Sequence, residues 1–159
     1  MPPALLFDLE TIDLNAKPLF DQEAIGRVNP QRFEMQQLDG ILWYDKDKAC
    51  VLGYKDVTDK EFWVRGHIPG RPLMPGVIQI ESAAQLVSWF VKEVYREEGF
   101  VGFGGLDRTK FRAAIEPGNR LYLLGHITEA RRGRRYVCDV QGVVDGNLAF
   151  EATISGMKV

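Results

Sequence analysis

Apolar side chains crowd one long stretch of the chain, and their pattern there is helical. Between Val77 and Glu97 they occupy nearly every side of a helix: Val77, Ile78, Ile80, Ala83, Ala84, Leu86, Val87, Trp89, Phe90, Val91 and Val94. A helix that is apolar on almost all sides is buried in a protein core. Glu81, Gln85 and Lys92 interrupt the run, so its unbroken apolar part is shorter than a membrane span requires. The pattern therefore predicts one long buried helix and no membrane segment.

Shorter segments on both sides of this helix have the composition of strands and are separated by turn residues. Strands are expected at residues 41–45, 49–57, 100–107, 110–114, 119–130, 136–144 and 148–155. Turns are expected at residues 45–48, 116–119, 131–135 and 145–147. Asp21 is expected to cap a short helix that runs to Val28. One long buried helix with several antiparallel strands predicts an α+β domain whose sheet wraps the helix.

Length and composition indicate one ordinary soluble domain. The chain has 159 residues, of which 45% are hydrophobic and 26% are charged. Residues 1–20 show no clear period, and we expect an N-terminal extension that lies across the surface or at a subunit contact. Residues 21–159 would then form the single domain. A net charge of −2 argues against a surface that binds nucleic acid.

Cysteine and histidine usage excludes several classes of site. Cys50 and Cys138 are far apart and form no CxxC pattern, and the chain holds only two histidines. No zinc ligand set is therefore predicted, and no other metal or cofactor is expected. Two distant cysteines do not indicate a disulfide scaffold, and the N-terminus lacks the basic and apolar regions of a signal peptide. A cytoplasmic location is expected.

The candidate chemistry lies where the long helix begins, in the segment RGHIPGRPLMPGVIQIESAAQ at residues 65–85. Pro75 suits the first helical position, because the N–H that proline lacks would have no acceptor there. The N–H groups of Gly76 and Val77 are expected to be free and to face any oxygen that becomes negative. Gly76 also has no side chain to keep a ligand away.

Two titratable side chains flank this start of the helix. Glu81 lies one turn before Gln85, within hydrogen-bond reach of it. A buried carboxyl group is costly unless it is hydrogen-bonded, so Glu81 is either a structural carboxylate held by Gln85 or a general acid. His67 precedes it in a loop stiffened by prolines and supplies a candidate base. A base, an acid and oxyanion donors are what the removal of a proton next to a carbonyl group requires.

This segment closely resembles the signature of the FabZ-type (3R)-3-hydroxyacyl-[acyl-carrier-protein] dehydratases, which have the hotdog fold. In GHIPGRPLMPGVIQIESAAQ the carboxylate Glu81 follows His67 by 14 residues (81 − 67), the spacing of that family. The segments GGLDRTKFRAAIEPGNRL at residues 104–121 and VVDGNLAFEATISG at residues 143–156 support the resemblance. It covers roughly residues 21–156 and implies a hotdog fold, an antiparallel sheet wrapped around a central helix.

The resemblance also implies a role for each residue of the site. His67 would take the α-proton of a (3R)-3-hydroxyacyl thioester, and Glu81 would protonate or orient the departing hydroxyl group. Gly76 and Val77 would bind the thioester oxygen, and Gln85 would orient the carboxylate. In this family the histidine and the carboxylate come from different subunits, so a homodimer or a trimer of dimers is implied, acting on substrates bound to acyl carrier protein. The related FabA-type dehydratase/isomerases carry aspartate at the carboxylate position, so glutamate implies a simple dehydratase.

The chain departs from the family pattern at five positions outside the catalytic groups: Gln31, Glu34, Gly40, Ile68 and Gly102. The acyl length, the carrier and the pathway therefore stay open between fatty-acid synthesis and related lipid or polyketide synthesis. Two alternatives also stay open. One is a non-catalytic hotdog subunit that binds acyl thioesters, and the other is a hotdog thioesterase.

A basic cluster marks one of the expected hairpin turns, with Arg131, Arg132, Arg134 and Arg135 around Gly133. An acyl carrier protein is acidic, so these arginines are candidates for steering and binding it. The alternative is an ordinary solvated hairpin tip.

Overall fold

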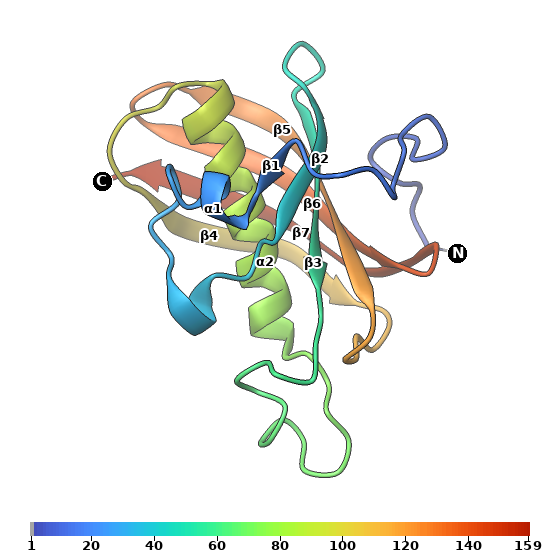
Figure 1. Cartoon of the computed structure of the whole chain (residues 1–159). Helices are drawn as coiled ribbons and strands as arrows, with labels where there is room; N and C mark the ends of the chain where they lie inside the picture. The colour runs from blue at the N-terminus through green and yellow to red at the C-terminus, as the bar shows by residue number, and fades with distance from the viewer. Residues whose placement is uncertain (1) are drawn as a thin grey trace.

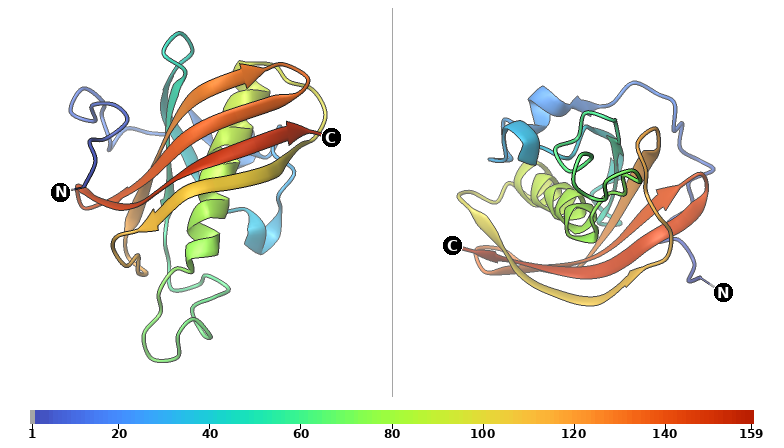
Figure 2. Two further views of the ribbon diagram at one scale, coloured as in Figure 1. Left: turned by 180° about the vertical axis from the view of Figure 1, so that it is seen from behind. Right: turned by 90° about the horizontal axis from the view of Figure 1, so that it is seen from below.

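The computed structural model describes residues 2–159 and shows a curved antiparallel sheet wrapped around one long helix (Figure 1 and Figure 2). The strands are β1 (Phe20–Asp21), β2 (Gly40–Asp45), β3 (Cys50–Asp56), β4 (Val101–Phe111), β5 (Arg120–Arg131), β6 (Arg135–Val144) and β7 (Asn147–Lys158). Their order across the sheet is β1-β2-β3-β5-β6-β7-β4. This arrangement confirms the predicted α+β architecture.

The central helix α2 (Gly76–Trp89) continues as a π-helical turn, η2 (Phe90–Val94), and ends before the predicted boundary at Glu97. Arg96 has a left-handed backbone with φ of 59°, a conformation that does not continue a right-handed helix. Glu97 lies outside the helix and accepts hydrogen bonds from the N–H of Gly133 at 2.5 Å and the hydroxyl of Tyr136 at 2.8 Å. These contacts bind the end of the helical segment to the turn between β5 and β6.

The short helix α1 (Gln22–Ile25) begins at the predicted cap. The carboxylate of Asp21 accepts a hydrogen bond from the N–H of Ala24 at 2.9 Å. The helix ends at Ile25 rather than at Val28, because Gly26 has a low helix propensity and occupies the C-cap. A 3-10 turn, η1 (Phe33–Met35), follows it and was not predicted.

Strand β4 corrects the sequence prediction, which placed separate strands at residues 100–107 and 110–114. It is one strand of 11 residues, paired with β7 and interrupted by two irregularities, between Phe103 and Gly105 and between Asp107 and Lys110. The second irregularity contains Arg108, whose φ of 47° is typical of a turn. Here the residue forms a bulge, and the strand continues beyond it. Because β4 is the last strand in the sheet order, its other edge has no neighbouring strand within residues 2–159.

The N-terminal extension lies across the outer face of the sheet. The side chain of Gln141 accepts a hydrogen bond from the N–H of Leu6 at 2.8 Å and donates one to the carbonyl of Ala4 at 3.0 Å. Phe7 packs against Trp43 with ring centroids 5.0 Å apart. The extension covers an apolar cluster that is separate from the core around α2, formed by Leu42, Leu52, Tyr54, Leu124, Val143 and Leu148. The domain boundary at residue 20 stays a prediction.

Within residues 2–159, no helix has both the length and the apolar character that crossing a membrane demands.

Candidate active site

His67 lies in the long loop between β3 and α2, which extends beyond the lower end of the helix in Figure 1. Its N–H donates to the carbonyl of Trp63 at 2.7 Å, and its carbonyl accepts the N–H of Leu73 at 2.9 Å. Its ring atom Nδ1 lies 2.8 Å from the carbonyl oxygen of Leu73. A carbonyl oxygen only accepts, so Nδ1 carries the proton and Nε2 of the neutral ring keeps a free lone pair. The imidazole is thus held with Nε2 free of any contact to Leu73.

The start of α2 presents two free backbone donors. Pro75 occupies the N-cap, one position earlier than predicted, and Gly76 is the first helical residue. The N–H groups of Gly76 and Val77 donate to no acceptor within the described part of the chain. A Cβ atom on Gly76 would lie 2.8 Å from the ring of Phe111, so only glycine fits beneath that ring without rearrangement.

Glu81 is held as the helical spacing predicted. Gln85 Nε2 donates to Glu81 Oε1 at 3.1 Å and to the carbonyl of Met35 at 2.7 Å. Gln85 Oε1 accepts the N–H groups of Gln37 at 2.9 Å and Leu38 at 3.1 Å. The amide of Gln85 is therefore fixed by the chain segment that leads into β2, and it fixes the position of the carboxylate in turn.

Two hollows adjoin these residues, and we name each after its titratable side chain. The His67 pocket has a volume of about 820 Å³ and is lined mainly by His67, Gly76, Val77, Ile80, Leu106 and Phe111. The Glu81 pocket has a volume of about 240 Å³ and is lined mainly by Glu81, Ala84, Val87, Ser88, Val91 and Tyr136. Phe103 of β4 lines both. A single chain thus brings His67 together with the free N–H groups but places Glu81 in the neighbouring hollow.

Two of the departures from the family pattern, Gln31 and Gly102, line the Glu81 pocket. Gln31 Oε1 is buried and has no hydrogen-bond partner within residues 2–159. Gln79 and Phe111 line the His67 pocket, although the sequence pattern did not single them out. Bulges interrupt the alternation of inward and outward residues along β4, so the sequence pattern did not show which way Phe111 faces. Gln79 is surrounded in the sequence by the apolar residues of the helix, so it did not stand out.

Among residues 2–159 no three His, Cys, Asp or Glu side chains gather as metal ligands would.

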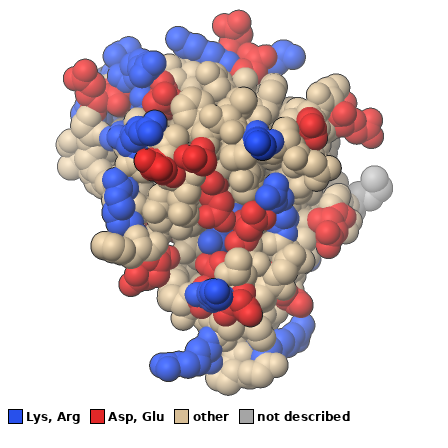
Figure 3. Space-filling view, in the orientation of Figure 1, with Lys and Arg blue, Asp and Glu red and all other residues tan. Residues whose placement is uncertain are grey.

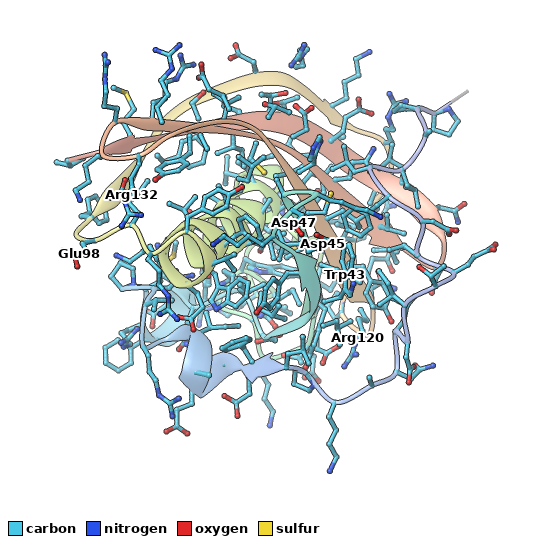
Figure 4. All side chains as sticks on the ribbon, turned by 90° about the horizontal axis from the view of Figure 1, so that it is seen from above. Trp43, Asp45, Asp47, Glu98, Arg120 and Arg132 are labelled. Atoms are coloured by element: carbon cyan, nitrogen blue, oxygen red, sulfur yellow. The ribbon has the colours of Figure 1, made fainter. Side chains whose placement is uncertain are left out.

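The arginine cluster lies at the other end of α2 from the His67 loop (Figure 1). In Figure 4, Arg132 lies on the same side of the view as Glu98, away from Trp43 and Arg120, and its guanidinium donates to the carbonyl of Arg96 at 3.1 Å. Part of the cluster's charge is already balanced, because Arg131 lies 3.3 Å and Arg135 3.8 Å from carboxylate oxygens of Glu129. Figure 3 shows acidic and basic side chains interspersed over the face it presents. Contact between the four arginines and a carrier protein stays a prediction.

A buried charged cluster lies beside the His67 loop, at the end of β3. Lys55 Nζ is 3.0 Å from Glu61 Oε1 and 3.9 Å from Asp39 Oδ2. Asp39 Oδ2 also accepts the N–H of Asp56 at 2.7 Å. Burial raises the pKa of Asp39 to about 6, although the attraction of Lys55 opposes the rise.

The raised pKa of Asp39 predicts how its contribution to stability changes with pH. The carboxyl ionises near 3.8 in the unfolded chain and near 6 in the folded one, so its contribution is present below about pH 4 and is lost as the pH rises through about 6. Asp39→Asn should therefore raise the free energy of unfolding relative to the wild type at pH 7.5, by at most about 3 kcal/mol. The gain should shrink at pH 4. Urea unfolding of both proteins at the two pH values measures it, and equal differences would contradict it.

Comparison with known proteins identifies relatives over most of the chain. The sequence model described as a FabA-like domain matches residues 29–153. A Clostridium botulinum protein named 3-hydroxyacyl-[acyl-carrier-protein] dehydratase FabZ is 36% identical over 136 residues, which is 84% of this chain and 92% of that protein. A Streptococcus gordonii protein of the same name is 34% identical over 140 residues, which is 86% of this chain and 96% of that protein.

Solved structures agree on the fold. The dehydratase heterocomplex ApeI:P of Xenorhabdus doucetiae matches with a TM-score of 0.70 at 13% identity, over 85% of this chain and 90% of that chain. The phenylacetic acid degradation protein PaaI of Thermus thermophilus matches with a TM-score of 0.57 at 14% identity, over 77% of this chain and 94% of that chain. At such low identity the likeness establishes the hotdog fold alone.

Proposed function

The chain belongs to the FabA-like family, and from this we propose that it is a 3-hydroxyacyl-[acyl-carrier-protein] dehydratase, a hydro-lyase of fatty-acid or related lipid or polyketide synthesis. Its relatives in Clostridium botulinum and Streptococcus gordonii carry that name over most of their length. The observation that carries the proposal is the imidazole of His67, oriented by Leu73 with Nε2 free and sharing a pocket with two unpaired backbone donors.

The proposed reaction removes water from a (3R)-3-hydroxyacyl thioester. Nε2 of His67 takes a proton from C2 while the C3–O bond breaks and the C2–C3 double bond forms. Negative charge that grows on the thioester oxygen is stabilised by the N–H of Gly76, with Val77 beside it. Glu81, in its protonated form, gives its proton to the departing hydroxyl group, and water leaves. Solvent then returns the proton from His67 to Glu81, which restores the starting state.

We place the site between two copies of the chain, since His67 and Glu81 line different, adjoining pockets in one chain. Strand β4 offers the surface for it. This edge strand of 11 residues has no partner on one side within residues 2–159 and carries exposed Phe103, Leu106 and Phe111. A long, apolar, unpaired edge pairs readily with another strand. A symmetric β4 contact would place the His67 pocket of one subunit against the Glu81 pocket of the other, and three such dimers would give the hexamer.

The Glu81 pocket would hold the acyl chain. It extends from the carboxylate along one face of α2, past Ala84 and Ser88 towards Val91. Its volume of about 240 Å³ accommodates roughly eight heavy atoms, if each takes about the 30 Å³ of a water molecule in the liquid. Short and medium acyl chains are therefore the proposed substrates.

Filling this pocket tests the acyl site. Ala84→Phe should reduce kcat/KM for an acyl chain that spans the pocket by at least about tenfold more than for a four-carbon chain, because a few displaced methylene groups cost that much. The exposed Ala16 lies in the extension, so Ala16→Phe is the matched control and should leave the ratio unchanged. A uniform loss for all chain lengths in Ala84→Phe would contradict this location of the acyl chain.

The activity itself is tested by running the reaction in reverse. Purified protein is given a short trans-2-enoyl thioester, and loss of the conjugated-enoyl absorbance is followed with a thiol reagent in parallel. Loss of absorbance without thiol release is expected. Release of thiol would instead indicate a thioesterase, and no change with carrier-bound substrates of several lengths would indicate a non-catalytic subunit.

A further inference from the structure

Lys55 is a buried lysine at the end of β3, with only 7% of its side chain exposed. Its Nζ lies 3.0 Å from Oε1 of Glu61, whose side chain is 10% exposed. Two charges buried in this way lose much of their hydration, and their attraction often does no more than offset that cost. Overall stability alone is therefore a weak reason for the pair, and its place in the chain suggests a more specific one.

Glu61 holds together a turn, residues 58–64, at the start of the long loop that carries His67. Its second carboxylate oxygen, Oε2, accepts the N–H of Thr58 at 3.0 Å and the hydroxyl of Thr58 at 3.1 Å. Its backbone carbonyl accepts the N–H of Val64 at 3.1 Å. Glu61 thus joins the strand, through Lys55, to Thr58 by its carboxylate and to Val64 by its backbone carbonyl.

The same turn holds the backbone of His67. Trp63, within the turn, is 4% exposed, and its carbonyl accepts the N–H groups of Gly66 at 3.1 Å and His67 at 2.7 Å. The sheet is therefore connected to the histidine by the Lys55–Glu61 ion pair, by the hydrogen bond from Val64 to Glu61, and by the hydrogen bond from His67 to Trp63, the neighbour of Val64 in the chain. The loop has no regular helix or strand between Asp56 and Gly76, so such tertiary contacts are what order it.

We propose that Lys55 and Glu61 are positioning residues, a buried ion pair that fixes the loop so that the His67 imidazole stays aimed at the reacting carbon. The inference rests on the proposed dehydratase function. Catalysis is sensitive to such placement, because a displacement of about 1 Å of a reacting group costs on the order of 10²-fold in rate.

Measuring both kcat and melting temperature in three variants distinguishes a positioning role of the pair from a purely stabilising one. Lys55→Met and Glu61→Gln should each lower kcat by roughly 10- to 10²-fold with a much smaller change in KM, and each should also lower the melting temperature. The double variant Lys55→Met with Glu61→Leu removes both charges of the pair, so its melting temperature should lie closer to the wild-type value than that of either single variant. Its kcat should stay low, because leucine cannot hold Thr58. Recovery of both kcat and melting temperature in the double variant would overturn the proposal.

A matched control lies at the same end of β3. Arg120 and Asp56 form an ion pair through two contacts of 2.7 and 2.9 Å, and neither side chain bonds to the turn that Glu61 closes. Asp56→Asn should weaken this pair and lower stability while kcat stays at the wild-type value. A loss of kcat in Asp56→Asn as large as in Glu61→Gln would show that any ion pair at this end of the sheet matters equally, and would overturn the specific role.

A second readout does not depend on activity. The chain has two histidines, and nitrogen NMR of the rings distinguishes the Nδ1–H tautomer, which the contact to Leu73 sets for His67. In Glu61→Gln the His67 signals should shift towards a mixture of tautomers and broaden, while those of His126 stay unchanged. Unaltered His67 signals together with unaltered kcat would overturn the proposal. An inactive wild type with the expected His67 shift would instead contradict the dehydratase function and leave the positioning intact.

Discussion

His67→Ala is expected to lower turnover by at least about 10²-fold, a typical contribution of a positioned general base. The variant keeps the free N–H groups of Gly76 and Val77 but has no group to take the proton from C2. Its folding should be nearly unchanged, because the side chain is exposed and its loss removes one hydrogen bond, to Leu73, worth about 1 kcal/mol. Hydration of a short trans-2-enoyl thioester measures the rate, and thermal unfolding measures the stability.

The other histidine supplies the control for this result. His126 lies in β5, opposite Asp139 of β6, and is remote in sequence from the loop between β3 and α2. His126→Gln should keep wild-type turnover. Normal turnover in His67→Ala would remove the base assignment, and equal losses in both histidine variants would indicate a general effect on folding.

Glu81→Gln is expected to lower turnover by a similar factor, on the order of 10²-fold or more, because an amide cannot protonate the leaving hydroxyl group. Glutamine has nearly the same shape as glutamate, and its carbonyl oxygen can still accept the hydrogen bond from Gln85 Nε2. The melting temperature should therefore change little. An unchanged rate would return Glu81 to the structural role that the sequence also allowed.

Combining the two variants tests whether each site is shared between subunits. In a dimer of one His67→Ala chain and one Glu81→Gln chain, a shared arrangement leaves one site with both groups intact and one with neither. Such a heterodimer, isolated with two different tags, should recover about half of the wild-type turnover per dimer. If His67 and Glu81 of the same chain acted together, both sites would be damaged and turnover would stay near the level of the single variants.

Patterns over a few neighbouring residues were enough to predict most of the secondary structure of this protein. The apolar run of α2, the cap at Asp21 and the turns between the later strands all follow from spacing over a few residues. The contact between Glu81 and Gln85 was predictable for the same reason, since residues four apart on a helix are neighbours. The free donors at Gly76 and Val77 follow from the fact that the first N–H groups of a helix have no partner within it.

Features that depend on residues far apart in the chain could not be predicted and emerged from the folded structure. The sequence did not predict that β4 is a single strand. The segment around Arg108 has the local character of a turn, but pairing with β7 continues on both sides of it, so it forms a bulge within one strand. The N-terminal extension is held on the outer face of the sheet by Gln141, which lies more than 130 residues further along the chain than Ala4 and Leu6, the residues it bonds to.

The arrangement of the site was decided in the same way. His67 and Glu81 lie in adjoining pockets because the β3–α2 loop and β4 meet at the start of α2, and nothing in the spacing of 14 residues (81 − 67) specifies that. The groups that the chain offers, and the local structure that holds each of them, follow from residues close together in the sequence. Their placement relative to one another was left to contacts across the sheet and the core, whose partners no local pattern identifies.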